Sequence, residues 1–240
     1  MLEEAKNHLK VDGGEDNVLI GTFIAAAREI AEHETSRAFI TQTWRMFLDE
    51  SPEEIEIPKA PLQSVDSIKA ISEVQSYVDE TSAAAQPVLK VGSTVGFTIA
   101  DTIAINRGGT REEELIILSI QPGISLTMTI NLANEHTLAQ ADLVEKYILV
   151  SKTSYLVDLP EDSVGRIKLK SGCTWPTHRE FASFIVEFKS GYGDAGSDLP
   201  APLRREILTL VKTFYDHRGI TVISGEDLRA MFDPFKTIYL

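Results

Sequence analysis

The chain has 240 residues, of which 43% are apolar and 25% charged, a balance typical of a folded globular protein. Its 36 acidic and 23 basic residues give a formal net charge of -13, which argues against nucleic acid or an anionic membrane as the main partner. No apolar run approaches the roughly 20 residues of a membrane span, and the single cysteine, Cys173, permits no internal disulfide. We therefore expect a globular protein that is cytoplasmic at synthesis and has no membrane partner.

The first third of the chain changes from helical to strand periodicity. Residues 2–10 predict a short helix, and Gly13 and Gly14 separate it from a longer one. The longer helix places its apolar side chains on one stripe: Val18, Leu19, Phe23, Ile24, Ala27, Ile30 and Ala31. Alternation of apolar and polar residues then predicts strands over 44–48, 55–58 and 65–71, and hence a small sheet after the helices.

Residues 85–149 differ from the rest because they contain no convincing amphipathic helix. They predict strands over 95–106, 113–120 and 126–132, separated by the turn sequences RGGTRE and QPGI. The earlier pattern resumes with strands over 153–160, 165–170 and 184–190. We interpret residues 85–149 as a β-rich barrel or sandwich inserted into an exposed loop, so that residues 1–84 and 150–240 form one discontinuous domain.

The C-terminal part predicts two helices and an apolar tail. Residues 201–218 have an apolar face of Leu203, Ile207, Leu210, Val211 and Phe214, and Gly219 is a typical stop. A shorter helix follows over 224–232. The tail that ends the sequence contains Met231, Phe232, Phe235, Ile238, Tyr239 and Leu240. Two alternatives are open for it: packing onto the core of the chain, or docking on a partner.

The segment SGYGDAG contains Gly191, Gly193 and Gly196 in the spacing G-x-G-x-x-G, which is typical of a dinucleotide-binding loop. Such a loop needs a helix that begins at the glycines, whereas here SDLPAP delays the helix to about Pro200–Pro202. Asp194 and Asp198 would also repel phosphates. The sequence therefore favours a glycine-rich turn between a strand and a helix, and it predicts no cofactor.

No other pattern favours catalysis or metal binding. The histidines His8, His33, His136, His178 and His217 are scattered without the spacing of metal ligands. Glu112 to Glu114 are interpreted as solvated charges on an edge strand, and Cys173 as a small residue beside Trp175. We therefore expect a protein that is not an enzyme, with no catalytic, cofactor-binding or metal-binding residues.

Four segments in this order resemble the head-to-tail connector (adaptor) proteins of long-tailed bacteriophages and prophages. They are LEEAKNHLKVDGGEDNVLIGTFIAAAREIAEHETSRAFITQTW, IPKAPLQSVDSI, GCTWP and FIVEFKSGYGDAGSDLPAPLRREILTLVKTFYDHRG. The resemblance covers the chain on both sides of residues 85–149 and does not extend to that insertion. It implies an α+β fold whose mainly helical connector domain carries a small β-sheet, together with the inserted module.

The resemblance also implies a structural role in the neck of the virion, after assembly in the host cytoplasm. Copies would form a twelvefold ring that contacts the portal protein on one side and a head-closure (stopper) or tail-terminator protein on the other. Double-stranded DNA would pass without sequence-specific binding, and the acidic charge would limit its adhesion. Candidate portal contacts are Phe232, Phe235, Ile238, Tyr239 and Leu240, and candidate contacts between subunits are Phe23, Arg28, Arg204 and Arg205.

The alternative function is a cell-surface or carbohydrate-binding virion module that acts through the β-rich insertion. A carbohydrate site would require a cluster of exposed aromatic side chains. The insertion contains only Phe97 and Tyr147, so the sequence favours the connector.

Overall fold

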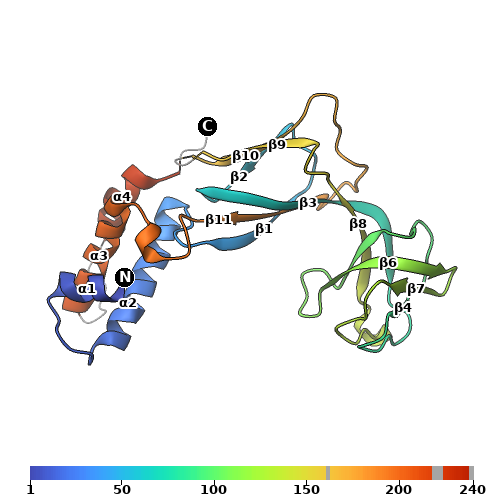
Figure 1. Cartoon of the computed structure of the whole chain (residues 1–240), viewed down its shortest axis with the longest axis horizontal. Coiled ribbons are helices and arrows are strands. Elements are labelled where there is room, and N and C mark those ends of the chain that lie inside the picture. Colours follow the sequence, from blue (N-terminus) through green and yellow to red (C-terminus); the bar gives the residue numbers. More distant parts are fainter. Residues whose placement is uncertain (161–162, 218–223, 238–240) are drawn as a thin grey trace.

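The structure is a computed structural model that describes residues 1–160, 163–217 and 224–237. The elements form three regions in a row along the long axis: a helical body, a pair of packed sheets and a β-barrel (Figure 1). The helices of the body are α1 (Leu2–Leu9), α2 (Asn17–Thr35), α3 (Ala201–Asp216) and α4 (Gly225–Phe232).

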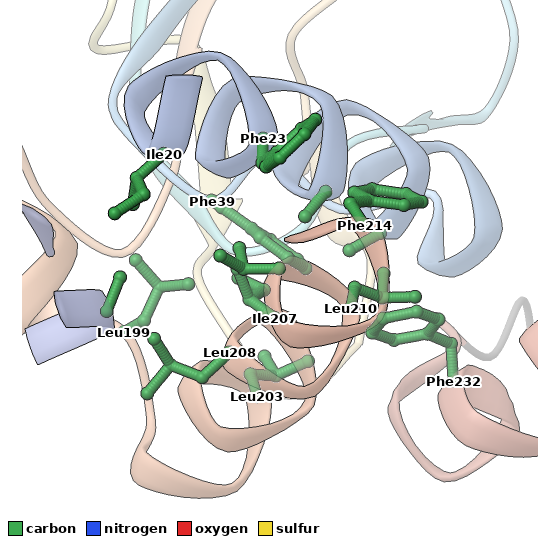
Figure 2. Close-up of a cluster of buried hydrophobic side chains, with 14 residues drawn as sticks. Ile20, Phe23, Phe39, Leu199, Leu203, Ile207, Leu208, Leu210, Phe214 and Phe232 are labelled. Carbon is green, nitrogen blue, oxygen red and sulfur yellow. The ribbon is translucent and has the colours of Figure 1, made fainter. Parts of the chain in front are cut away.

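The helical body is held together by the apolar faces of α2 and α3. Phe23 of α2 meets Phe214 of α3 with ring centroids 6.0 Å apart, and Ile20, Ile207 and Leu210 are fully buried beside them (Figure 2). The periodicity of three and four residues in both helices places these side chains on one face. The predicted apolar face of α3 is confirmed, although α3 ends at Asp216 and the expected stop at Gly219 lies outside the described residues. The predicted stripe of α2 is wrong at one position, because Val18 in the first turn is 85% exposed and Ile20 is buried in the core instead.

One antiparallel sheet of eight strands runs from the body to the far end of the molecule. Its order is β1 (Gln42–Leu48), β11 (Phe184–Ser190), β3 (Leu62–Tyr77), β8 (Leu143–Leu149), β5 (Thr102–Ile105), β6 (Glu113–Gln121), β7 (Ser125–Met128) and β4 (Val88–Lys90). A second sheet has the order β2 (Glu54–Ile57), β10 (Gly165–Leu169) and β9 (Tyr155–Asp158). It packs on the β1–β11–β3 part of the large sheet through a shared core that includes Ile57, Ile167, Phe184 and Phe188.

The strands from residue 88 to residue 149 curl into a barrel together with the end of β3. A bridge between Val78 and Val91 brings the strand that follows β4 back to the end of β3. The interior is apolar and contains Leu89, Ile103, Ile105, Leu126 and Val144, all fully buried. Of the two alternatives for the inserted module, barrel or sandwich, the structure has the barrel.

The predicted α+β class is confirmed, but the expected dominance of helices is not, because the sheet has eight strands. Strand β8 had no counterpart among the predicted strands, since Glu145 and Lys146 in its centre hide the alternation of apolar residues. The strand expected over 95–106 is confined to Thr102–Ile105, because a loop with positive φ at Gly96 and Ala100 precedes it. The domain boundaries stay a prediction, and β3 and β8 both run from the sheet pair into the barrel.

Candidate partner-binding site

The C-terminal segment lies against the helical body. Phe232, at the end of α4, is fully buried in the core of α2 and α3 (Figure 2). Phe235 is partly buried against the same core. The backbone N–H of Thr237 donates to the carbonyl of Thr35, the last residue of α2, at 3.1 Å. Ile238, Tyr239 and Leu240 lie outside the described residues. Phe232 was predicted to contact the portal, but in this chain its side chain is buried in the core of the helical body.

Arg37 joins this segment to the rest of the body. Its side chain lies at the C-terminus of α2 and the residue is only 5% exposed. Nε donates to the carbonyl oxygen of Phe235 at 2.7 Å, and Nη1 donates to the Tyr192 hydroxyl at 2.8 Å. A buried guanidinium needs such partners because an unsatisfied charged donor is costly in a low-dielectric interior.

Tyr192 is supplied by the glycine-rich turn, and α3 begins only at Ala201, as the sequence predicted. Gly191 has φ +139°, and a Cβ at this position would lie 2.5 Å from the carbonyl group of Ile40. The turn is tied to the segment before β1 by the N–H of Thr41, which donates to the carbonyl of Gly193 at 2.8 Å. Asp198 accepts from the N–H of Ala195 at 2.9 Å, so its carboxylate occupies the turn.

The four predicted subunit contacts are spread over two helices and do not form one cluster. Phe23 is 8% exposed and packs inside the chain, whereas Arg205 lies on the surface beside Glu206. Arg28 is half-buried near Glu32, and Arg204 forms an ion pair with Glu4 at 3.0 Å. Contacts between subunits through these residues stay a prediction.

A cluster of ion pairs at the junction of sheet and barrel was not anticipated from the sequence. Glu145 of β8 is 1% exposed and accepts from Arg107 at 2.6 Å and from Arg179 at 2.5 Å. Burial by itself raises the pKa of the Glu145 carboxyl, but the two guanidinium groups outweigh it and hold the pKa below its usual range. Residues 107 and 179 are far apart in the chain, so no local spacing could have revealed the cluster.

The acidic run Glu112 to Glu114 belongs to the same junction. Glu112 pairs with Arg45 of β1 at 2.7 Å, and Glu114 pairs with Lys69 of β3 at 2.7 Å. Lys69 and Arg45 also share Glu187 of β11, at 2.9 and 3.1 Å. The interpretation as solvated charges is therefore wrong, since these carboxylates connect the barrel to the parent sheet.

Glu113 points the other way, into a buried polar group of the barrel. Its carboxylate accepts from the N–H groups of Ala133 and Asn134, and it faces Nε2 of His136 at 3.2 Å. Asp142 faces Nδ1 of the same ring at 2.7 Å. Burial raises the pKa of the Glu113 carboxyl, but the hydrogen bonds that its charged form accepts from Ala133, Asn134 and His136 outweigh burial and lower the pKa below its usual range.

Across the described parts of the chain, no three His, Cys, Asp or Glu side chains are grouped so that they could hold a metal ion. Among the same residues, no helix combines the length and apolar character of a membrane span. In the insertion, Phe97 and Tyr147 are 5% and 3% exposed, so neither ring is available to stack on a sugar.

The whole fold resembles chains from solved gene transfer agent (GTA) particles. One comes from the neck of an empty GTA particle computed with C6 symmetry, with a TM-score of 0.55, 14% identity, and coverage of 100% of this chain and 90% of that chain. A second comes from the virion of a native GTA particle, with a TM-score of 0.55, 15% identity and the same coverage. A third comes from the neck of a native GTA particle computed with C12 symmetry, with a TM-score of 0.55, 13% identity, and coverage of 100% and 89%.

The amino-acid sequence was also compared with curated proteins and with protein families. No curated protein matches the chain. Residues 1–90, which hold α1, α2 and the first strands, match the family of phage gp6-like head-tail connector proteins. Over residues 1–90 the chain is thus similar to the phage gp6-like head-tail connector proteins, and this match bears out the head-tail connector role predicted from the sequence.

Proposed function

We propose that copies of this chain form a ring in the neck of a phage particle, where the ring joins the DNA-filled head to the tail. The observation that carries the proposal is the match of residues 1–90 to head-tail connectors. It is supported by the likeness of the whole fold to chains of GTA necks, which extends over 100% of this chain. The role is structural and not catalytic.

The partners follow from this position in the particle. The ring contacts the portal protein on the head side and a head-closure or tail-terminator protein on the tail side. A twelvefold ring is favoured by the C12 symmetry used for one of the similar necks. A closed ring requires a heterologous contact, in which two different surfaces of each copy meet. Assembly takes place in the host cytoplasm.

Double-stranded DNA passes through the ring without sequence-specific binding. The net charge of -13 supports this proposal, because each Lys or Arg contact to a phosphate adds salt-dependent adhesion, and an acidic passage avoids it. The proposal fails if the assembled ring places Arg204, Arg205 and Lys212 on the channel wall and the acidic side chains outside.

The barrel extends from the sheet at the end of the molecule opposite the helical body (Figure 1). We place it at the outside of the ring, where it adds contacts or decoration. Its exposed apolar side chains include Ile99, Ile116, Leu118 and Ile130, which are aliphatic and suit contact with protein. No observation favours the alternative of a carbohydrate-binding module.

The test is electron microscopy of particles made without this gene, with the gene restored in trans as the control. Loss of the connector should leave DNA-packed or leaking heads beside finished, unattached tails. Complete virions that only fail to adsorb to the host would refute the connector role and would favour receptor binding by the barrel.

A further inference from the structure

We propose that Arg37 positions the partner-binding end of the chain by fixing where the C-terminal segment leaves the helical body. The inference rests on the proposed function, in which this segment contacts the portal. Arg37 is the point where three parts of the sequence meet: the end of α2, the glycine-rich turn and the segment after α4.

The geometry of the guanidinium supports a positioning role. Nε and Nη1 are held in one plane, so the bond to the Phe235 carbonyl and the bond to the Tyr192 hydroxyl fix the direction of the side chain together. The backbone of Arg37 is fixed as well, because its N–H donates to the Thr35 hydroxyl at 3.3 Å. A flexible lysine ammonium offers no such fork.

The glycine-rich turn holds the Tyr192 hydroxyl in place. The Tyr192 ring meets the Phe39 ring edge to face, with centroids 6.5 Å apart, and Phe39 is fully buried. The N–H of Tyr192 donates to the carbonyl of Phe39 at 3.3 Å. The close approach of Gly191 to Ile40 is what brings Tyr192 to this position.

In the part of the chain that the structure describes, one backbone hydrogen bond attaches the segment after α4 to the end of α2. Lys236 donates its N–H within the turn to Asp233, and Thr237 donates to Thr35. The Thr237 amide therefore reports directly on whether the segment is docked. If Arg37 holds the segment, removing its side chain should free this amide and leave the α2–α3 core intact.

The experiment is hydrogen exchange of the full chain, followed at the Thr237 amide and at core amides of α2 and α3. In Arg37→Ala we expect exchange at Thr237 to rise at least about tenfold, because a hydrogen bond made by a charged group accounts for such a factor. Tyr192→Phe should show a smaller rise, and Arg37→Lys should restore protection only in part. Arg166→Ala is the matched control, since it removes an arginine that pairs with Glu54 and Asp158 in the small sheet and has no part in the helical body.

The outcomes separate a positioning role from a general one. Faster exchange at Thr237 alone supports the proposal, and unchanged exchange at Thr237 overturns it. An equal loss of protection in α2 and α3 also overturns it, because Arg37 would then stabilise the whole body.

Portal binding is measured separately with the purified portal and a chain that lacks residues 233–240. If the shortened chain and the full chain bind the portal with the same affinity, the proposed portal contact of this segment is refuted. The exchange result for Arg37 is not affected by that outcome. If the deletion abolishes binding, Arg37→Ala should weaken binding and Arg37→Lys should recover part of it. Unchanged portal binding by Arg37→Ala would then refute the role of Arg37 in partner binding.

Discussion

Gly191 is the position in the turn where the residue type is most restricted. Its φ of +139° is disfavoured for any residue with a Cβ, and an added Cβ would meet the Ile40 carbonyl at 2.5 Å. Gly191→Ala should therefore lower the free energy of unfolding by about 1 to 3 kcal/mol, measured by urea denaturation. It should also loosen the docking of Tyr192.

Gly21 is the control, because its substitution by alanine should change the free energy of unfolding in the opposite direction. It lies on the exposed face of α2, where an added Cβ meets no atom within 4 Å. Gly21→Ala should raise the free energy of unfolding by about 1 kcal/mol, because alanine favours the helical backbone. If both variants had the same effect, the packing argument for Gly191 would be wrong.

At the scale of elements, the junction between β3, β8 and β11 depends on Glu145. Glu145→Gln leaves Arg107 and Arg179 without their carboxylate in a buried site, so we expect a loss of about 3 kcal/mol at pH 7. The control is Asp216→Asn, which removes an exposed ion pair with Lys212 and should change the free energy of unfolding by about 0.5 kcal/mol or less.

The same variant predicts a dependence on pH. The folded pKa of Glu145 is depressed, so the stability that its charge contributes is present above the unfolded pKa of about 4.3 and is lost as the pH falls through the folded pKa. The difference between wild type and Glu145→Gln should therefore narrow below about pH 4. Urea denaturation between pH 7 and pH 2.5 measures this difference in the free energy of unfolding. A difference that stays constant over this range would show that the charge of Glu145 does not cause it.

The elements also show which parts of the fold a sequence can reveal. Helices α2 and α3 follow from local periodicity, and so does the late start of α3 after the glycines. Strand β8 does not, because the partners of its polar centre come from distant loops: Arg107 and Arg179 pair with Glu145, and Asp101 pairs with Lys146. The role of Arg37 is hidden for the same reason, since its partners lie 155 and 198 residues further along the chain.

The connector domain and the barrel share strands β3 and β8, so removal of the barrel changes the parent sheet as well. The sequence boundary at residue 149 coincides with the end of β8, which pairs with β3 in the parent sheet. Deletion of residues 85–149 would therefore expose the edge of β3 and leave Arg179 without Glu145. We expect that chain to aggregate.

A cut within the barrel keeps β8 on the edge of β3 and keeps Glu145 beside Arg179. The new edge strand is then β8, whose charged residues Glu145 and Lys146 disfavour pairing with another chain. Tyr77 of β3 and Leu143 of β8 are direct partners, so residues 78–142 can be replaced by the two-residue turn Asn-Gly. Val144 loses its apolar surroundings and is changed to Thr in the same chain. Arg179 keeps Glu145, and Arg45 and Lys69 keep Glu187, so each of these cations retains a carboxylate.

We expect this shortened chain to fold with the helices of the full protein and to unfold in a single cooperative transition. Circular dichroism and gel filtration measure both properties, with the 85–149 deletion as the comparison. Because the barrel is placed outside the ring, the shortened chain should also assemble and bind the portal. A folded chain that fails to assemble would instead assign the barrel to the contact between neighbouring copies, and an unfolded one would show that barrel and connector are a single folding unit.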